Sequence, residues 1–331
     1  MTRFIPFFLI LITASASPLW AWTVPGTGQT ACYNNTTLLP NCPFPGAVFY
    51  GQNGNYKKLH LFQDDGNGVV HDMVTKLPWQ KVSELTTRNW NDAATYCENL
   101  AIGTYTNWRL PTIHELLTIV NNGKASPKFD SIFEGNPQGH YWSGSKVTPD
   151  STGYAWAIDF GDGRTTSNEK TSTCVVRCVH GATLPSSVYV DNLDGTVTDQ
   201  TTRIVWEKIS SVSAMTWENA LAYCESRTTG GHDDWRMPNI QELNSLADYS
   251  RIYPDPSIDP IFTVPSGQYE SYWSSTTVLF SSDYYSLAWY ITFDHGQAQY
   301  GIAKSTLIKV RCVRNLDTPA SALPASFLLM N

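Results

Sequence analysis

The sequence predicts an α+β protein made of two tandem copies of one domain, each with two helices and a mainly antiparallel sheet. Shifted by about 127 residues, the chain aligns with itself. Within each copy, helical periodicities precede alternating segments typical of strands. Each copy also has two cysteines at matching positions. Five tryptophans per copy align: Trp79, Trp90, Trp108, Trp142 and Trp156 with Trp206, Trp217, Trp235, Trp273 and Trp289.

The first residues are typical of an export signal. Arg3 supplies a positive start, residues 4–12 are apolar, and the small residues up to Ala16 form a cleavage pattern, with a second after Ala21. We assign residues 1–21 as a signal peptide. The apolar run is shorter than the roughly 20 residues of a membrane span, and no comparable run follows. We therefore expect a protein without a membrane span that is secreted, cell-surface or periplasmic in a bacterium.

The charge pattern argues against nucleic acid as a partner. Asp and Glu total 29 against 22 Lys and Arg, and the basic residues form no run. Nucleic-acid affinity depends largely on clustered basic side chains that neutralise phosphates. Because 42% of the residues are hydrophobic, the chain has enough apolar material for two cores.

Each copy is predicted to contain an amphipathic helix in its early part and a second one after the proline of a W-R-x-P phrase. Thr112 and Glu115 have the spacing of a capping box. Asn239 and Glu242 offer a similar cap in copy 2, so these motif residues are explained by structure. Alternation later in each copy predicts strands that enter turns, at Trp156, Ile158 and Phe160 and at Trp289, Ile291 and Phe293.

These patterns divide the chain into five parts. Residues 22–59 form a Gly, Pro and Asn-rich segment after the signal peptide. Copy 1 covers residues 60–180 and copy 2 covers residues 187–315, with the short linker GATLPSS between them. Residues 316–331 form a C-terminal tail.

Seven cysteines in an exported chain indicate disulfides. The repeat favours one bridge within each copy, and the N-terminal segment has a pair of its own. Cys174 is left over: it is a free thiol, it forms an intermolecular bond, or it exchanges roles with Cys178. The expected bridges are Cys97–Cys178, Cys224–Cys312 and Cys32–Cys42.

Four phrases occur twice in one order: W-x-x-A-x-x-Y-C, W-R-[LM]-P-x-x-x-E-L, Y-W-S and V-R-C-V. They resemble the C-terminal domain of the Legionella collagen-like adhesin (Lcl), over about three quarters of the chain. The resemblance implies a C-type-lectin-like fold with a helix-to-strand disulfide, and for that adhesin it implies binding of sulfated polysaccharides. The present chain differs from the adhesin, because it has no collagen-like repeat and an acidic balance.

Ligand contacts are expected where the copies differ, because loops vary without disturbing the core. The loop before Trp289 offers aromatic faces and a carboxylate for a sugar ring, and copy 1 has a shorter counterpart before Trp156. Turns after Gly163 and Gly296 are expected to lie nearby. The candidate ligand-binding residues are Asp283, Tyr284, Tyr285, Gln297, Gln299, Asp150, Tyr154, Arg164 and Asn168.

Two acidic segments, residues 64–72 and 191–199, resemble calcium loops because they place carboxylates around a glycine turn. A β-turn that leads into a strand accounts for the same acidic and glycine residues. The second segment also lacks the later bidentate Glu of an EF-hand. We favour the hairpin and expect no other cofactor. The possible ligands are Asp64, Asp72, Asp191, Asp194 and Asp199.

Catalysis finds little support in the sequence. None of the seven histidines aligns with a histidine of the other copy, and none has the spacing of a metal site. The sequence favours an adhesin-like binding protein that recognises an extracellular glycan or protein. One alternative is a structural component of an envelope or filament. A relative of formylglycine-generating enzymes is disfavoured, because the matched cysteines are assigned to disulfides.

Overall fold

The structure is a computed structural model. The expected signal peptide lies outside the described residues except for Ala21, and so does the tail after residue 316. No helix among the described residues is long and apolar enough to cross a membrane. The described residues are 21–316 without 59, 137–138, 149–152, 252–254, 264–269 and 295–296.

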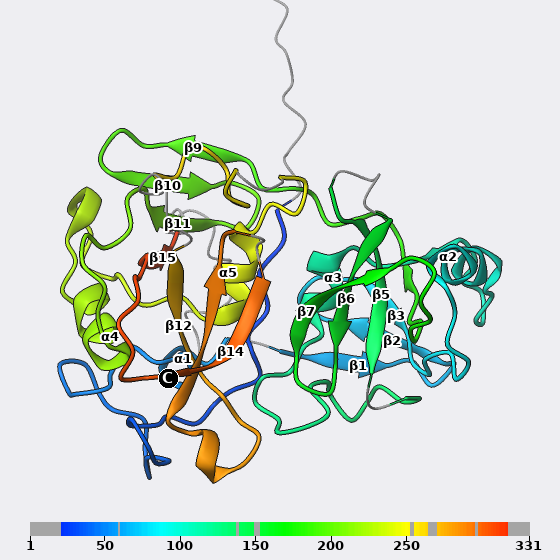
Figure 1. The fold of residues 1–331 in the computed structure, drawn as a ribbon, viewed down its shortest axis with the longest axis horizontal. Coiled ribbons are helices and arrows are strands. Elements are labelled where there is room, and N and C mark those ends of the chain that lie inside the picture. Colours follow the sequence, from blue (N-terminus) through cyan, green and yellow to red (C-terminus); the bar gives the residue numbers. More distant parts are fainter. Residues whose placement is uncertain are drawn as a thin grey trace, which may run out of the picture.

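The two copies form two lobes side by side, each of mixed helices and antiparallel sheets (Figure 1). This architecture is α+β, as the sequence predicts. The expected order, with helices before strands, is wrong, because three strands precede the first helix of each copy. Copy 1 contains β1 (Phe62–Asp64), β2 (Val69–Asp72), β3 (Pro78–Gln80), α2 (Trp90–Asn99), β4 (Trp108–Arg109), α3 (Ile113–Thr118), β5 (His140–Lys146), β6 (Tyr154–Asp159), β7 (Arg164–Glu169) and β8 (Val179–His180).

Copy 2 repeats this order with small differences. A short helix, α1 (Asn53–Tyr56), precedes both copies in the N-terminal segment. Copy 2 contains β9 (Tyr189–Asp191), β10 (Thr196–Asp199), β11 (Ile204–Glu207), α4 (Trp217–Glu225), the 3-10 helix η2 (Thr229–Gly231), α5 (Ile240–Leu246), β12 (Ser271–Thr277), the 3-10 helix η3 (Ser282–Tyr284), β13 (Leu287–Thr292), β14 (Gln297–Ala303) and β15 (Val313–Asn315).

The sheet of each copy is split into two, which the alternating patterns do not reveal. Copy 1 has sheets of order β1-β2-β3-β8-β4 and β5-β6-β7, and copy 2 has β15-β11-β10-β9 and β12-β13-β14. The paired strands of these sheets are antiparallel. In each copy a parallel bridge, Tyr141–Val175 or Tyr272–Lys309, reaches from the three-stranded sheet to the chain before the last strand.

The matched tryptophans that begin the first helices make the same contact in both copies. Trp90 begins α2 and Trp217 begins α4, and each indole N–H donates to a backbone carbonyl at 2.8 Å, of Ser143 and Ser274 respectively. Each of these carbonyls belongs to the first strand of a three-stranded sheet. The first helix therefore packs on the three-stranded sheet through the same tryptophan contact in both copies. This shared contact explains why a tryptophan occurs at this position of each copy.

The three disulfides of the structure are the pairs expected from the sequence. Two of them connect the first helix of a copy to the segment beside its last strand. The third closes a ten-residue separation in the N-terminal segment. Cys174 is a buried free cysteine. The bridges are Cys97–Cys178, Cys224–Cys312 and Cys32–Cys42.

The arginine of each V-R-C-V phrase is buried in the core, which the sequence did not suggest. Arg177 is 1% and Arg311 0% exposed. Each guanidinium lies over aromatic rings, including Phe133 at 4.9 Å and Phe262 at 5.1 Å. Each therefore joins loops to the core through its donors. Arg177 donates to the carbonyls of Gln80, Lys81 and Glu134, and Arg311 to those of Glu207, Lys208 and Thr263.

The copies meet through equivalent elements, so an approximate two-fold axis relates them. α3 packs on α5, and β7 lies beside β14 (Figure 1). The His114 ring nitrogen lies 2.9 Å from the carbonyl of Ala247, and the Gln241 amide donates to the equivalent carbonyl of Val120 at 3.1 Å. One hydrophobic cluster contains buried residues of both copies. The two domains therefore pack as one unit.

The N-terminal segment runs down the boundary between the lobes and then along copy 2 (Figure 1). The Tyr33 ring packs on Tyr285 with a centroid distance of 4.8 Å. The Asn35 amide donates to Glu218 at 2.8 Å. The segment thus covers part of copy 2 before it enters copy 1.

Candidate functional site

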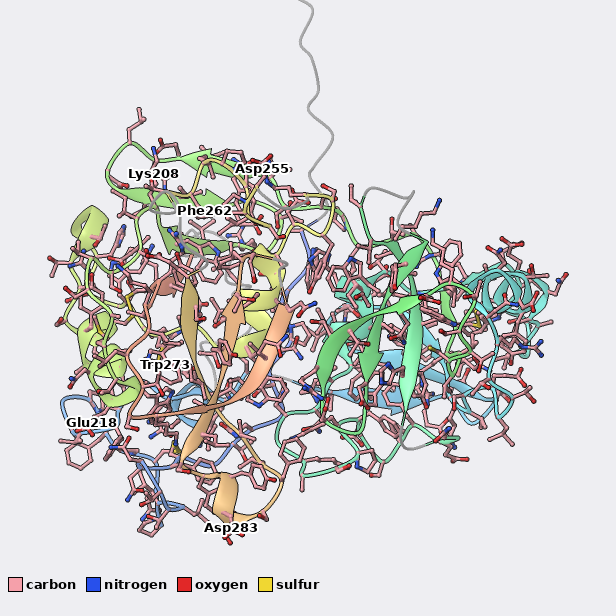
Figure 2. All side chains as sticks on the ribbon, viewed as in Figure 1. Lys208, Glu218, Asp255, Phe262, Trp273 and Asp283 are labelled. Carbon is pink, nitrogen blue, oxygen red and sulfur yellow. A yellow bond between two sulfur atoms is a disulfide. The ribbon has the colours of Figure 1, made fainter. Side chains whose placement is uncertain are left out.

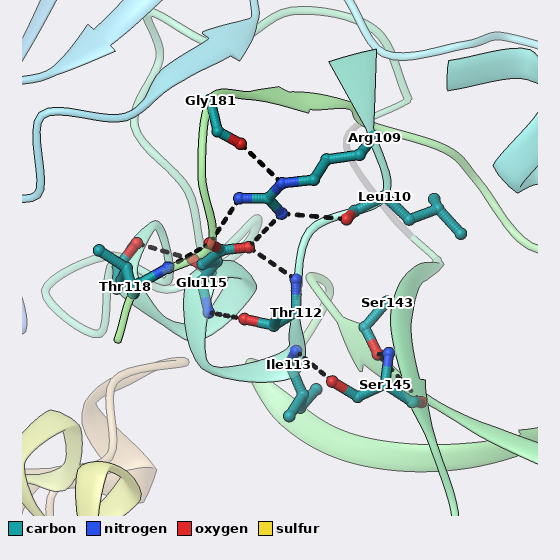
Figure 3. Close-up of polar contacts among 10 residues, drawn as sticks. Arg109, Leu110, Thr112, Ile113, Glu115, Thr118, Ser143, Ser145 and Gly181 are labelled. Atoms are coloured by element: carbon teal, nitrogen blue, oxygen red, sulfur yellow. Dashed lines mark hydrogen bonds and ion pairs between the residues drawn. The ribbon is translucent and has the colours of Figure 1, made fainter. Parts of the chain in front are cut away.

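The arginine and glutamate of the W-R-x-P-x-x-x-E phrase are part of the scaffold. In copy 1, Arg109 binds both carboxylate oxygens of Glu115 at 2.7 Å (Figure 3). Glu115 also accepts the backbone N–H of Thr112, which completes the predicted capping box at the start of α3. Leu184 of the linker donates its N–H to the same carboxylate at 2.9 Å. The motif therefore fixes a helix start and the path into copy 2.

Copy 2 uses the same pair with one addition. Arg236 binds Glu242 at 2.6 and 2.7 Å, and the Lys58 ammonium, from the segment that leads into copy 1, also binds Glu242. Glu242 is fully buried. Burial alone raises the pKa of this carboxyl, but the charges of Arg236 and Lys58 hold the pKa well below its usual range.

The five carboxylates proposed for calcium belong to hairpins and turns. Asp64 and Asp191 pair with Lys81 at 2.8 Å and Lys208 at 2.6 Å. Asp72 and Asp199 are buried at strand ends and accept backbone N–H groups of the turns that follow. Asp194 accepts the N–H and hydroxyl of Thr196. Within the described ranges, no group of three His, Cys, Asp or Glu side chains is placed to hold a metal ion.

The predicted loop of copy 2 lies at a tip of the molecule. Asp283 and Tyr284 lie in η3, and Figure 2 shows Asp283 at the lower end of copy 2. Tyr284 is 39% exposed and packs edge-on against Phe280 at 5.3 Å. Tyr285 is partly covered by Tyr33. An exposed aromatic surface is therefore present here, but it is small.

The structure separates the other predicted residues from this loop. Thr292 pairs with Gln297 and Leu287 with Ala303, so Gln297 lies at the far end of the hairpin from η3. Five strand residues correspond to about 17 Å. The proximity expected between the loop and the turn after Gly296 is therefore not observed. Asp150 lies outside the described residues.

The remaining candidates lie on strands near the boundary between the copies. Tyr154, at the start of β6, donates to Glu169 at 3.0 Å. Arg164 and Asn168 lie on β7, which packs beside β14 with Gln297 and Gln299. Their side chains make contacts within the protein: Arg164 with Asp162 at 2.8 Å, Asn168 with His140 at 2.9 Å, and Gln299 with Gln297 at 2.8 Å.

A cavity of about 530 Å³ opens between the two copies and the linker. This volume lies within the range of ligand sites, about 300–1,000 Å³. Copy 1 contributes the start of α3 and the end of β5, and copy 2 contributes the end of α5 and the turn after it. Its walls include Trp22, Ile113, His114, Ser145, Lys146, Thr148, Leu184, Tyr189, Ser245, Ala247, Asp248, Tyr249, Ser250 and Asp259.

The walls of the cavity combine aromatic rings with hydroxyl and charged groups. Trp22, Tyr189 and Tyr249 are the aromatic members, and Asp248 and Asp259 add carboxylates. Hydroxyls accept and donate hydrogen bonds, whereas aromatic faces contact apolar ring surfaces. This arrangement suits a polar ligand with some apolar surface, such as a sugar or a peptide.

His114 connects the cavity to the boundary between the copies. Its ring packs edge-on against Tyr249 at 5.1 Å and contacts the carbonyl of Ala247. Burial lowers the pKa of the imidazole, so the ring is neutral near pH 7. We therefore assign His114 a structural role in the wall.

Comparison with known families accounts for both copies. A model of the Lcl C-terminal domain matches residues 68–180 and again residues 195–314. The chain belongs to the Lcl C-terminal domain family. The cavity therefore lies between two Lcl C-terminal domains, and the family indicates an adhesin-like surface protein. No curated protein matches the chain.

Sequence reasoning missed the cavity, because its walls are far apart in the chain. Residues 145–148 and 245–250 meet only when the two Lcl C-terminal domains pack together. A signal was present in the alignment of the copies, since Lys146 aligns with Thr277 and Asp248 with Asn121. The sequence alone does not show that these differing residues lie close together, because only the packing of the domains brings them to one cavity.

Cys174, the cysteine left over from the bridges of the two Lcl C-terminal domains, is not an activated nucleophile. The side chain is 4% exposed and accepts a contact from the Asn168 amide at 3.2 Å. Burial raises the pKa of the thiol, which disfavours the reactive thiolate. The environment is that of a structural cysteine.

Proposed function

We propose that the protein is an adhesin-like binding protein located outside the bacterial cytoplasm, and that its two Lcl C-terminal domains bind one ligand in the cavity between them. The cavity of about 530 Å³, with walls from both copies, carries this proposal. The family and the disulfides support an extracytoplasmic location. A C-type-lectin-like interpretation of the domains belongs to the same proposal.

The proposed ligand is a glycan or a protein that is not strongly acidic. Asp248 and Asp259 line the cavity, and the whole chain has a formal net charge of −7. A sulfated polysaccharide would meet two carboxylates there and one ammonium, that of Lys146, so like charges predominate. The family's binding role is therefore retained in this proposal, while the ligand differs from that of the collagen-like adhesin.

The test is an array of neutral, acidic and sulfated glycans together with extracellular proteins, probed with residues 22–331 in calcium and again with a chelator. We expect saturable binding that Ser250→Trp weakens at least about tenfold, because the new ring fills the cavity mouth. Ser172→Trp, at an exposed turn outside the cavity, is the matched control and is expected to bind like the wild type.

Other outcomes would move the assignment. Binding that survives Ser250→Trp and disappears in Tyr284→Ala places the ligand on η3, where the exposed ring of Tyr284 favours a second candidate site. Loss of binding with the chelator supports the acidic turns as calcium sites. If nothing on the array binds, a structural envelope component becomes the better assignment.

A further inference from the structure

The approximate two-fold axis creates two equivalent grooves at the boundary between the copies. The first groove lies between Thr277, at the end of β12, and the turn at residues 121–123. The second lies between Lys146, at the end of β5, and the turn at residues 248–250. Both turns have the same geometry: the N–H of the third residue donates to the side chain of the first at 3.0 Å. The two grooves therefore have the same framework.

The first groove is filled by the protein's own residues 27–29. The Gln29 side chain donates to the carbonyl of Thr277 and accepts its N–H, both at 3.0 Å. The carbonyl of Thr27 accepts the N–H of Gly123 at 3.2 Å. The groove thus holds a short peptide segment, bent at Gly28, through backbone groups and one carboxamide.

Glycine is required at the centre of this bound segment. Gly28 has φ of +77°, and a Cβ there would lie 2.1 Å from Oδ1 of Asn121. A larger residue would need both an unfavourable backbone conformation and a shift of Asn121. Asp248, the residue equivalent to Asn121, has nearly the same shape. We therefore expect the second groove also to require a glycine at the centre of a bound segment.

The second groove is the open cavity. The residues equivalent to Thr277, Asn121 and Gly123 of the first groove line it: Lys146, Asp248 and Ser250. The second groove is open, whereas residues 27–29 fill the equivalent first groove on the other side of the axis. The walls are therefore built twice, and the described chain supplies an occupant only once.

We propose that the cavity binds a polypeptide segment that bends at a central glycine, in the manner in which the first groove binds residues 27–29. This inference rests on the proposed function and names its ligand class. The N–H of Ser250 takes the place of the Gly123 N–H toward a ligand carbonyl. Asp248 and Asp259 disfavour acidic residues beside the glycine.

The probe is a peptide with the sequence of residues 24–31, VPGTGQTA, acetylated and amidated, titrated into residues 22–331 by calorimetry. We expect saturable binding of one peptide per chain. Ser250→Trp in the protein should weaken it at least about tenfold, and Ser172→Trp should leave it unchanged. A peptide carrying Gly28→Val should bind at least about tenfold more weakly than the parent.

The outcomes separate this inference from the proposed function. Absence of peptide binding, or equal binding to Ser250→Trp, overturns the peptide inference. If Ser250→Trp then still abolishes binding of a glycan from the array, the cavity remains the ligand site and its ligand is a saccharide. If no binding depends on Ser250, both proposals fall.

Discussion

Glu242→Ala is expected to lower the free energy of unfolding by about 3–5 kcal/mol. The Glu242 carboxylate is fully buried and binds Arg236, which is 3% exposed, and also Lys58. Removing the carboxylate leaves the Arg236 guanidinium buried without its ion-pair partner. It also removes the acceptor for the N–H of Asn239 at the start of α5. Urea denaturation followed by tryptophan fluorescence measures the loss.

Glu115→Ala is the matched comparison. Glu115 is equally buried, but the side chain of its partner Arg109 is 24% exposed and can be hydrated after the change. We expect a smaller loss than for Glu242→Ala, about half as large, because the uncompensated charge is nearer to solvent. Equal losses would contradict the explanation from buried charge.

Stability is expected to rise with pH between about 7 and 10, through two buried lysines. Lys128 and Lys304 are 0% and 1% exposed, and burial lowers the pKa of each ammonium to about 7. In this window the unfolded chain holds protons that the folded protein has released. Each lysine therefore adds up to about 1.4 kcal/mol of stability per pH unit.

The rise should end near pH 10. Burial raises the pKa of Tyr33 to about 12, whereas an unfolded tyrosine releases its proton near pH 10, so stability falls above that point. Thermal melts across this range measure the profile. Lys304→Met should reduce the slope, and Lys76→Met, at an exposed position, should leave it unchanged. A flat profile from pH 7 to 9 in the wild type would contradict the account.

The elements that the sequence predicted best are those with local signals that occur twice. The helices at Trp90 and Trp217 and the capping boxes at Thr112 and Asn239 are all present. Periodicity and capping depend on residues within a few positions of each other. The repeat then favoured one cysteine pair in each copy, although it left open whether Cys174 or Cys178 forms the bridge of copy 1.

The features that the sequence did not predict depend on contacts between distant residues. The split of each sheet follows from which strands pair, not from their alternation. The buried Arg177 and Arg311 look like surface residues in the sequence, since arginine is seldom buried without a partner. Their partners are carbonyl groups and aromatic rings from separate loops.

The candidate site also depends on contacts between residues that are distant in the sequence. Tyr284 was expected on an exposed loop and is exposed. The packing of α3 on α5 brings Ser145 and Ser250 to one cavity, and neither was a candidate. Nothing in the local sequence indicates how two copies pack, because the contact between His114 and Ala247 joins residues 133 positions apart.

Hydrogen–deuterium exchange of residues 22–331, with and without the ligand found on the array or the glycine-centred peptide, tests the central claim most directly. The claim is that both copies together form one ligand site. It predicts slower exchange at residues 145–148 and 245–250 together when ligand is bound, with little change at residues 281–285. Protection confined to one copy, or to residues 281–285 alone, would contradict it.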